Sequence, residues 1–163
     1  YGKIIGGGMP VGAYGGRAEI MEHISPDGKV YQAGTLSGNP VAMAAGIATL
    51  KECLQKDFYG RLLDKMAYFE EIIRHATIDK GYAFQMIHIG SIFWFAFSRK
   101  EKIHSASDID SETMKLFKTF YHRLLETGVY LGPSGYEVGF ISLAHTEEIL
   151  SEAAAVLRDA LKG

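Results

Sequence analysis

The residues with the clearest chemical potential open the chain, where Lys3 stands before the glycine run Gly6-Gly7-Gly8 and Pro10. Glycine and proline disfavour a helix there, and glycine lets the backbone approach a ligand closely. A lysine amine that is partly buried in such a pocket has a lowered pKa, so it becomes a nucleophile that can form a Schiff base with an aldehyde. The residues alone also allow a second interpretation, in which Lys3 is a surface lysine beside a loop.

A second group of flexible and polar residues lies within residues 31–40. Gly34 frees the backbone, and Thr35 supplies a hydroxyl group. Asn39-Pro40 predicts a helix start, because asparagine caps helices and proline favours their first position. Backbone N–H groups, hydroxyl groups and the positive end of a helix together bind anions, and a phosphate group is the obvious candidate. The other interpretation is a capped helix that follows a polar loop.

A nucleophilic lysine and a phosphate loop in one short region suggest a particular cofactor. Pyridoxal 5′-phosphate carries an aldehyde that needs an amine and a phosphate that needs an anion site. We therefore expect this cofactor, in its aldehyde form (PLP) or its amine form (PMP), and we expect no metal.

The elements that must hold these segments follow from the hydrophobic pattern. Residues 1–16 predict two short strands around a glycine-proline turn, and residues 17–24 predict a short helix. Later in the chain, apolar residues recur at helical or strand spacing. Helices are predicted over 40–54, 58–76, 110–127 and from 146 onwards, and strands over 84–89, 91–97, 129–131 and 138–143. The strand at 91–97 has aromatic residues on both faces, so it should be central and covered.

Composition argues against several classes of partner. The formal net charge of −2 gives no electrostatic reason to expect nucleic acid or an anionic membrane surface as a partner. No segment reaches the roughly 20 apolar residues that a helix needs to span a bilayer. The single Cys53 excludes an internal disulfide and favours a reducing, cytoplasmic setting.

Three segments together resemble a known enzyme family. They are the opening segment Lys3–Gly16, residues 31–40, and residues 129–146, which contain the Tyr136-Glu137 pair. The combination is similar to class III pyridoxal-phosphate aminotransferases, and residues 33–37 resemble the glutamate-1-semialdehyde 2,1-aminomutase branch of that family. Two positions depart from the family pattern. Gly135 stands where the family has a larger polar residue, and Val138 stands where it has a smaller one.

The resemblance implies roles for individual residues. Lys3 would bind the cofactor aldehyde and then move protons between the substrate and the cofactor. Gly34 and Thr35 would bind the phosphate of the cofactor that sits in the partner subunit, so that the site spans a homodimer interface. Tyr31 would lie on the substrate side of this shared pocket, and Glu137 near its entrance. The residues themselves allow Tyr31 to be an interface residue without a chemical role, and Glu137 to be an exposed strand carboxylate.

The resemblance also implies a fold and a division into domains. The fold class is α/β, as the C-terminal part of a fold-type I PLP-dependent transferase that lacks most of its large domain. Residues 1–57 would be the end of the PLP-binding large domain, with the lysine strand, the phosphate loop and a linking helix. Residues 58–163 would be a small α/β domain with helices on one face of its sheet.

The implied reaction is an isomerisation of a small molecule, glutamate-1-semialdehyde to 5-aminolevulinate, which serves tetrapyrrole biosynthesis. The candidate catalytic lysine is already the third residue, so we expect this chain to be the C-terminal fragment of a longer protein. We expect the fragment to be inactive alone, because the family places the aspartate that contacts the cofactor ring upstream. One alternative is a class III aminotransferase that uses an external oxo acid, and another is a non-catalytic dimerisation domain.

Overall fold

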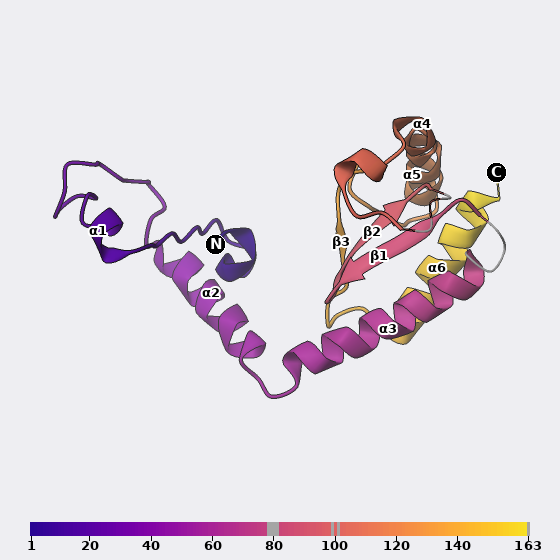
Figure 1. The fold of residues 1–163 in the computed structure, drawn as a ribbon. Helices are drawn as coiled ribbons and strands as arrows, with labels where there is room; N and C mark the ends of the chain where they lie inside the picture. The colour runs from indigo at the N-terminus through magenta and orange to yellow at the C-terminus, as the bar shows by residue number, and fades with distance from the viewer. Residues whose placement is uncertain (78–81, 99, 101, 163) are drawn as a thin grey trace. The chain divides into compact units, whose positions relative to one another are not determined.

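The computed structural model of the protein describes residues 1–77, 82–98, 100 and 102–162 (Figure 1). Its contacts divide the chain into two compact units, residues 1–58 and residues 59–163, called the N-terminal and C-terminal units below. The boundary falls at the first residue of a long helix, α3, which spans Phe58–Ala76.

The N-terminal unit is built around one regular helix, α2, which spans Pro40–Cys53. The predicted start of this helix is confirmed, because the Oδ1 atom of Asn39 accepts the N–H groups of Val41 at 3.1 Å and Ala42 at 3.2 Å. The other elements are the short helix α1, Ala18–Met21, and a single turn of 3-10 helix, η1, at Lys3–Gly6.

The two strands predicted within residues 1–16 are not formed. Lys3 lies in η1, and only an isolated bridge between Gly2 and Gly12 remains of the expected pairing. Gly7 adopts a left-handed conformation with φ of 58°, and its N–H group donates to the carbonyl of Ile4 at 3.1 Å. This hydrogen bond closes a helical turn, which the strand interpretation had not anticipated.

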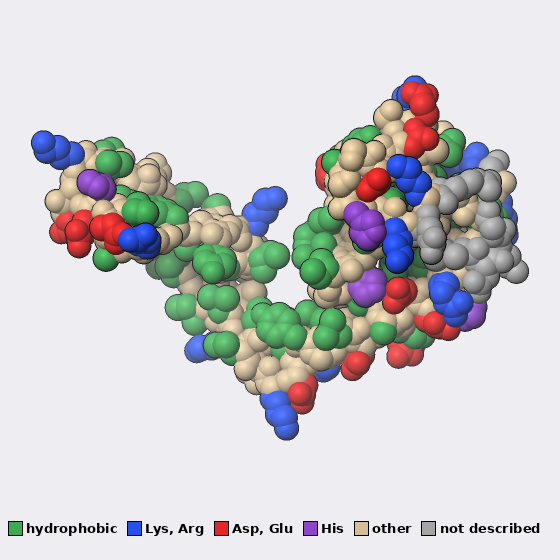
Figure 2. Space-filling model, in the orientation of Figure 1, with side chains coloured by type: hydrophobic (Ala, Val, Ile, Leu, Met, Phe, Trp, Pro, Cys, Tyr) green, Lys and Arg blue, Asp and Glu red, His purple; other side chains and the backbone are tan. Residues whose placement is uncertain are grey.

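The N-terminal unit buries almost nothing. All its 58 residues are described, and only Gly6, Ala42 and Gly46 are buried. Its large apolar side chains are partly or fully exposed, and Figure 2 shows them over much of the surface around α2. Those exposed on α2 and just after it are Val41, Met43, Ile47, Leu50 and Leu54. Burial of large apolar groups is the main stabilising term in folding, so this unit needs a further surface to cover it.

The C-terminal unit combines a three-stranded antiparallel sheet with helices. The strand order is β1-β2-β3, so the prediction that residues 91–97 form the central strand is confirmed. The strands are β1 (Gln85–Ile89), β2 (Ile92–Ala96) and β3 (Gly139–Phe140). The helices that follow α3 in this unit are η3 (Ala106–Asp108), α4 (Ser111–Met114), α5 (Leu116–Glu126) and α6 (Glu147–Leu161).

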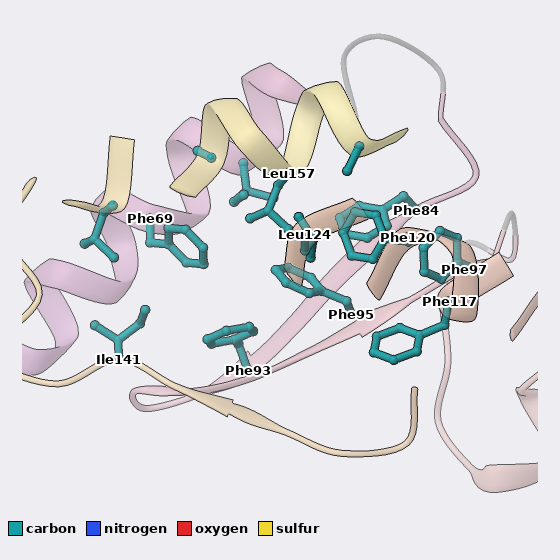
Figure 3. Close-up of a cluster of buried hydrophobic side chains, with 14 of the residues drawn as sticks. Phe69, Phe84, Phe93, Phe95, Phe97, Phe117, Phe120, Leu124, Ile141 and Leu157 are labelled. Atoms are coloured by element: carbon teal, nitrogen blue, oxygen red, sulfur yellow. The ribbon is translucent and has the colours of Figure 1, made fainter. Parts of the chain in front are cut away.

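Aromatic side chains fill the space between one face of this sheet and the helices (Figure 3). Phe93 and Phe95 alternate along β2, so both point to the same side, and their ring centroids are 4.9 Å apart. Phe95 also contacts Phe84, at 5.0 Å between centroids, and Phe120 of α5, at 6.4 Å. The core is completed by residues of α3 and α6, including Phe69 and Leu157.

Three predicted elements of the C-terminal unit differ in the structure. Residues 129–131 form no strand, because the N–H group of Val129 donates to Leu124 at the end of α5. The strand predicted over 138–143 shortens to Gly139–Phe140, since the N–H group of Ser142 turns to the Nδ1 atom of His145 at 3.0 Å. The helix predicted over 110–127 divides into α4 and α5 at Lys115, where the hydrogen bonds have i to i−3 spacing. None of the described helices is long and apolar enough to cross a membrane.

The aromatic core yields a prediction for stability. Phe95→Ala should lower the free energy of unfolding of the C-terminal unit by about 3–5 kcal/mol, because it leaves a cavity among packed rings. Phe140→Ala, which removes the same atoms from a side chain that is 52% exposed, should cost about 1 kcal/mol or less. Urea unfolding followed by circular dichroism measures both, and equal losses would contradict the assignment of the core.

The cap of α2 yields a second prediction. Asn39→Ala should weaken this helix by about 1 kcal/mol, because it leaves two N–H groups of the first turn without an acceptor. Amide hydrogen exchange at Val41 and Ala42 should become faster. Asn39→Asp keeps the acceptor oxygen and should preserve the protection, so faster exchange in both variants would speak against the cap.

Candidate functional site

Lys3 is presented by η1 on the surface of the N-terminal unit. Its side chain is exposed and borders an open hollow whose other walls are residues 8–12. The sequence predicts a partly buried amine, and residues 1–58 do not bury it. The backbone of Lys3 has a φ of 37°, in a region that side chains other than glycine rarely adopt. The lysine is therefore accessible to a ligand while its backbone is held in an unusual conformation.

Two glycines let η1 and its C-terminal cap Gly7, together called the lysine turn, approach α2 closely. A Cβ atom on Gly46 would lie 2.5 Å from the carbonyl oxygen of Ile5, and a Cβ atom on Gly7 would lie 2.5 Å from the carbonyl oxygen of Ala45. Neither position can carry a side chain without moving the backbone of its neighbour. The sequence analysis did not single out Gly46, although a glycine inside a helix often marks a close approach.

The loop that carries Gly34 lies next to the lysine hollow. A second hollow is lined by residues 10–12, by Gly34 and residues 36–38, and by Met43 of α2. It shares residues 10–12 with the hollow beside Lys3. The structure therefore brings Lys3 and Gly34 to adjoining hollows of one surface. Thr35 lies in the same loop but does not line either hollow.

The N–H groups that remain for an anion belong to this loop and not to the helix. Pro40 has no N–H group, and Asn39 already accepts the N–H groups of Val41 and Ala42, so the start of α2 offers no free donor. Within the described part of the chain, the N–H groups of Gly34 and Thr35 and the hydroxyl group of Thr35 donate to no other group. The capped-helix interpretation thus holds for the helix end, while the preceding loop keeps three donors.

These groups fit the chemistry of pyridoxal phosphate. An exposed primary amine suits its aldehyde, and unpaired N–H and hydroxyl donors suit its phosphate. Among the described residues, no group of three or more His, Cys, Asp or Glu side chains is placed to hold a metal ion.

Tyr31 stands apart from both hollows. Its side chain is 83% exposed, and it donates to and accepts from no described residue. The structure of this chain therefore assigns it no contact with Lys3 or Gly34.

Glu137 belongs to the C-terminal unit and is exposed. It precedes β3, so of the alternative interpretation, an exposed strand carboxylate, the exposure holds and the strand does not. Its carboxylate folds over Gly132, where a Cβ atom would lie 2.5 Å from Oε2. The side chain thus lies over the loop of residues 132–138.

This loop is fixed to the sheet by Trp94, which lies on the strand that the sequence predicts to be central and covered. Its indole Nε1–H donates to the carbonyl oxygen of Gly135 at 2.7 Å. Gly135 also packs tightly, since a Cβ atom there would lie 2.8 Å from Cε of Met114. A tryptophan on a strand needs a partner for its N–H group, and that requirement could have drawn attention to Trp94.

Comparison with known proteins identifies close relatives. Residues 1–161 match the family described as aminotransferase class-III. Over 98% of the chain, the sequence is 50% identical to a glutamate-1-semialdehyde 2,1-aminomutase of Akkermansia muciniphila and 44% identical to one of Bdellovibrio bacteriovorus. The chain covers 37% and 38% of these two proteins, so it spans little more than a third of their length.

Solved structures agree with this assignment. A β-phenylalanine aminotransferase from Variovorax paradoxus matches 99% of this chain and 37% of its own, with a TM-score of 0.83 and 29% identity. A transaminase with PLP bound matches 98% of this chain and 36% of its own, with a TM-score of 0.77 and 29% identity. The expected fold class, part of a PLP-dependent transferase, is confirmed, and pyridoxal phosphate is supported as the cofactor. The chain belongs to the class III aminotransferase family.

Proposed function

We propose that this chain is the C-terminal part of a glutamate-1-semialdehyde 2,1-aminomutase, a PLP-dependent isomerase that forms 5-aminolevulinate. The observation that carries the proposal is its identity of 50% and 44%, over 98% of its length, to two proteins of that name. The exposed amine of Lys3 and the unpaired donors of the Gly34 loop give the proposal a chemical basis, with the amine serving the chain's own cofactor and the loop that of the partner subunit. By extension, the whole enzyme works in the cytoplasm and supplies tetrapyrrole biosynthesis.

Lys3 is the catalytic residue of the proposal. When bound, pyridoxal phosphate supplies an aldehyde that takes up amines and a ring that withdraws electrons from the reacting carbon. The Nζ atom of Lys3 holds the cofactor in place and, once an amine has replaced it, accepts and returns the proton at the substrate carbon.

Gly34 and Thr35 are the proposed phosphate ligands. Their two N–H groups and one hydroxyl group lack partners in the described chain, and a phosphate can accept all three. In the proposed homodimer, each subunit offers this loop to the cofactor of the other. Tyr31, which is 83% exposed here, would then face the substrate side of the shared pocket.

Glu137 is the proposed carboxylate at the substrate entrance. Its position over Gly132 and its exposure suit a group that meets the amine of an incoming substrate.

The chain alone is proposed to be inactive. It spans little more than a third of the length of its relatives, and its N-terminal unit has no large buried side chain. The aspartate that the family places on the cofactor ring is expected in the remaining part. Isolated, the exposed apolar surface of residues 1–58 should drive self-association.

A second function has a specific observation in its favour. The Variovorax paradoxus protein that shares this fold is named an aminotransferase, so the whole enzyme could use an external oxo acid as amino acceptor. That reaction uses the same Lys3 and the same phosphate loop. A non-catalytic dimerisation domain would need neither group.

The first test concerns Lys3 and uses the full-length enzyme that contains this chain. With glutamate-1-semialdehyde and no added oxo acid, the enzyme should form 5-aminolevulinate. Lys3→Ala should lower the rate by on the order of 10²–10⁴-fold, because it removes the proton carrier. Lys51→Ala removes an exposed lysine of α2 and should leave the rate unchanged.

The outcomes separate the alternatives. Turnover that requires an oxo acid but still depends on Lys3 would indicate the aminotransferase. An unchanged rate in Lys3→Ala would exclude both reactions at this site and leave the dimerisation domain.

The second test concerns the phosphate loop. In the same full-length enzyme, Thr35→Ala should weaken cofactor binding by about 10-fold to 100-fold, because a hydrogen bond to a charged group contributes roughly 1.5–3 kcal/mol. Thr35→Ser keeps the hydroxyl group and should retain most of the affinity. Titration of the apoenzyme with pyridoxal phosphate gives the dissociation constants, and equal values for all three proteins would remove Thr35 from the site.

A further inference from the structure

The backbone of Lys3 is held in a conformation that it would not adopt freely. Its φ of 37° is one of two positive values among the described residues that are not glycine, the other being that of Asp57. A side chain in this region crowds its own backbone, so the conformation persists only where surrounding contacts impose it.

Helix α2 supplies those contacts through residues that lie one turn apart. The carbonyl oxygen of Ile5 occupies the place where Gly46 would carry a Cβ atom, at 2.5 Å. On the other side of the turn, Gly7 lies so close to the helix that its own Cβ atom would be 2.6 Å from Oγ1 of Thr49. The segment from Ile5 to Gly7 is therefore pressed against α2, and Lys3 is the first residue of the same helical turn.

Gly46 is unfavourable for α2 itself. Glycine inside a helix is less stable than alanine, and Gly46 lies in the middle of Pro40–Cys53. It is also buried, so it is covered by η1 and does not face solvent. Alanine at this position would make α2 itself more stable. The glycine is therefore explained by the close contact with Ile5 of the lysine turn.

We propose that Gly46 is a positioning residue for Lys3, which holds the lysine turn against α2 and so directs the Nζ atom towards the cofactor. The inference rests on the proposed role of Lys3. It assigns to α2 a task besides carrying the phosphate loop at its N-terminal end, since the same helix then positions Lys3 for the chain's own cofactor and the loop for the cofactor of the partner subunit.

The test compares two glycine-to-alanine variants of the full-length enzyme. Gly46→Ala adds a methyl group that meets the Ile5 carbonyl, whereas Gly2→Ala adds the same group next to Lys3 in open space, with nothing within 4 Å. Each protein is loaded with pyridoxal phosphate, treated with borohydride to fix the bond between cofactor and lysine, and digested for mass analysis. Total bound cofactor is measured on the same samples by its absorption.

We expect Gly46→Ala to reduce the covalent bond between cofactor and Lys3 while non-covalent binding of the cofactor is retained. Wild type and Gly2→Ala should carry the cofactor fixed to Lys3. Gly46→Ala should still bind the cofactor through its phosphate, but the share fixed to Lys3 should fall by on the order of tenfold or more, because a displacement of about 1 Å can cost 10²-fold in a positioned reaction. A purely structural role of Gly46 would instead lower cofactor binding and bonding together, which would contradict the inference.

A second variant and a crystal structure guard against misfolding. Thr49→Leu enlarges the side chain beside Gly7 and leaves Gly46 unchanged, so it should displace the same turn. If Gly46→Ala yields no folded enzyme, Thr49→Leu decides the question by the same two measurements. The crystal structure of either variant should show Lys3 with a negative φ.

The failures of the two proposals differ. If the share fixed to Lys3 and its φ remain as in wild type, the positioning role is wrong while the role of Lys3 stands. If the wild-type enzyme itself binds the cofactor without a bond to Lys3, the proposed function at this residue is wrong, and a φ of Lys3 that is unchanged in Gly46→Ala would then overturn the positioning role as well.

Discussion

The contact between the lysine turn and helix α2 is the constraint on which the N-terminal unit depends. The Ile5 carbonyl and the Gly46 backbone touch without an intervening side chain, and Gly7 approaches the carbonyl oxygen of Ala45 in the same way. Residues 1–58 bury no large apolar side chain, so this close contact joins η1 to α2 while the apolar side chains of the unit still need a further surface to cover them. It links Lys3 to the helix that follows the Gly34 loop, so in the proposed dimer one helix supports the amine of one site and the phosphate donors of the other.

The C-terminal unit is stabilised in a different way. Phe93 and Phe95 of β2 pack with rings from the helices and from the segment before β1, which gives this unit its own apolar core. The opposite face of β2 presents Trp94, whose N–H group fixes the loop that ends in Glu137. One face of the central strand thus packs in the core, and the other face holds the loop that carries the candidate substrate carboxylate.

The parts of this structure that were predictable from sequence are those that depend on local signals. Asn39-Pro40 specifies a helix start by its own side chains, and the spacing of Met66, Phe69 and Ile73 specifies one face of α3. The errors arose where two elements compete for one backbone group. Val129 could pair in a sheet or close the end of α5, and Ser142 could extend β3 or bind His145. Hydrophobic patterns do not decide such competition. For the candidate site, the residue types of Lys3, Gly34 and Thr35 were visible, but the supporting roles of Gly46 and Trp94 depend on contacts between distant segments.

Trp94 is the only tryptophan in the chain, and its N–H group contacts the Glu137 loop directly. Indole emission depends on the hydrogen bonding and solvation of the ring. Within this chain, any event that moves Gly135 away from the sheet also changes the surroundings of its one indole ring, so Trp94 is an intrinsic optical probe of this loop. Movement at the candidate substrate entrance can in this way be followed in real time without a label.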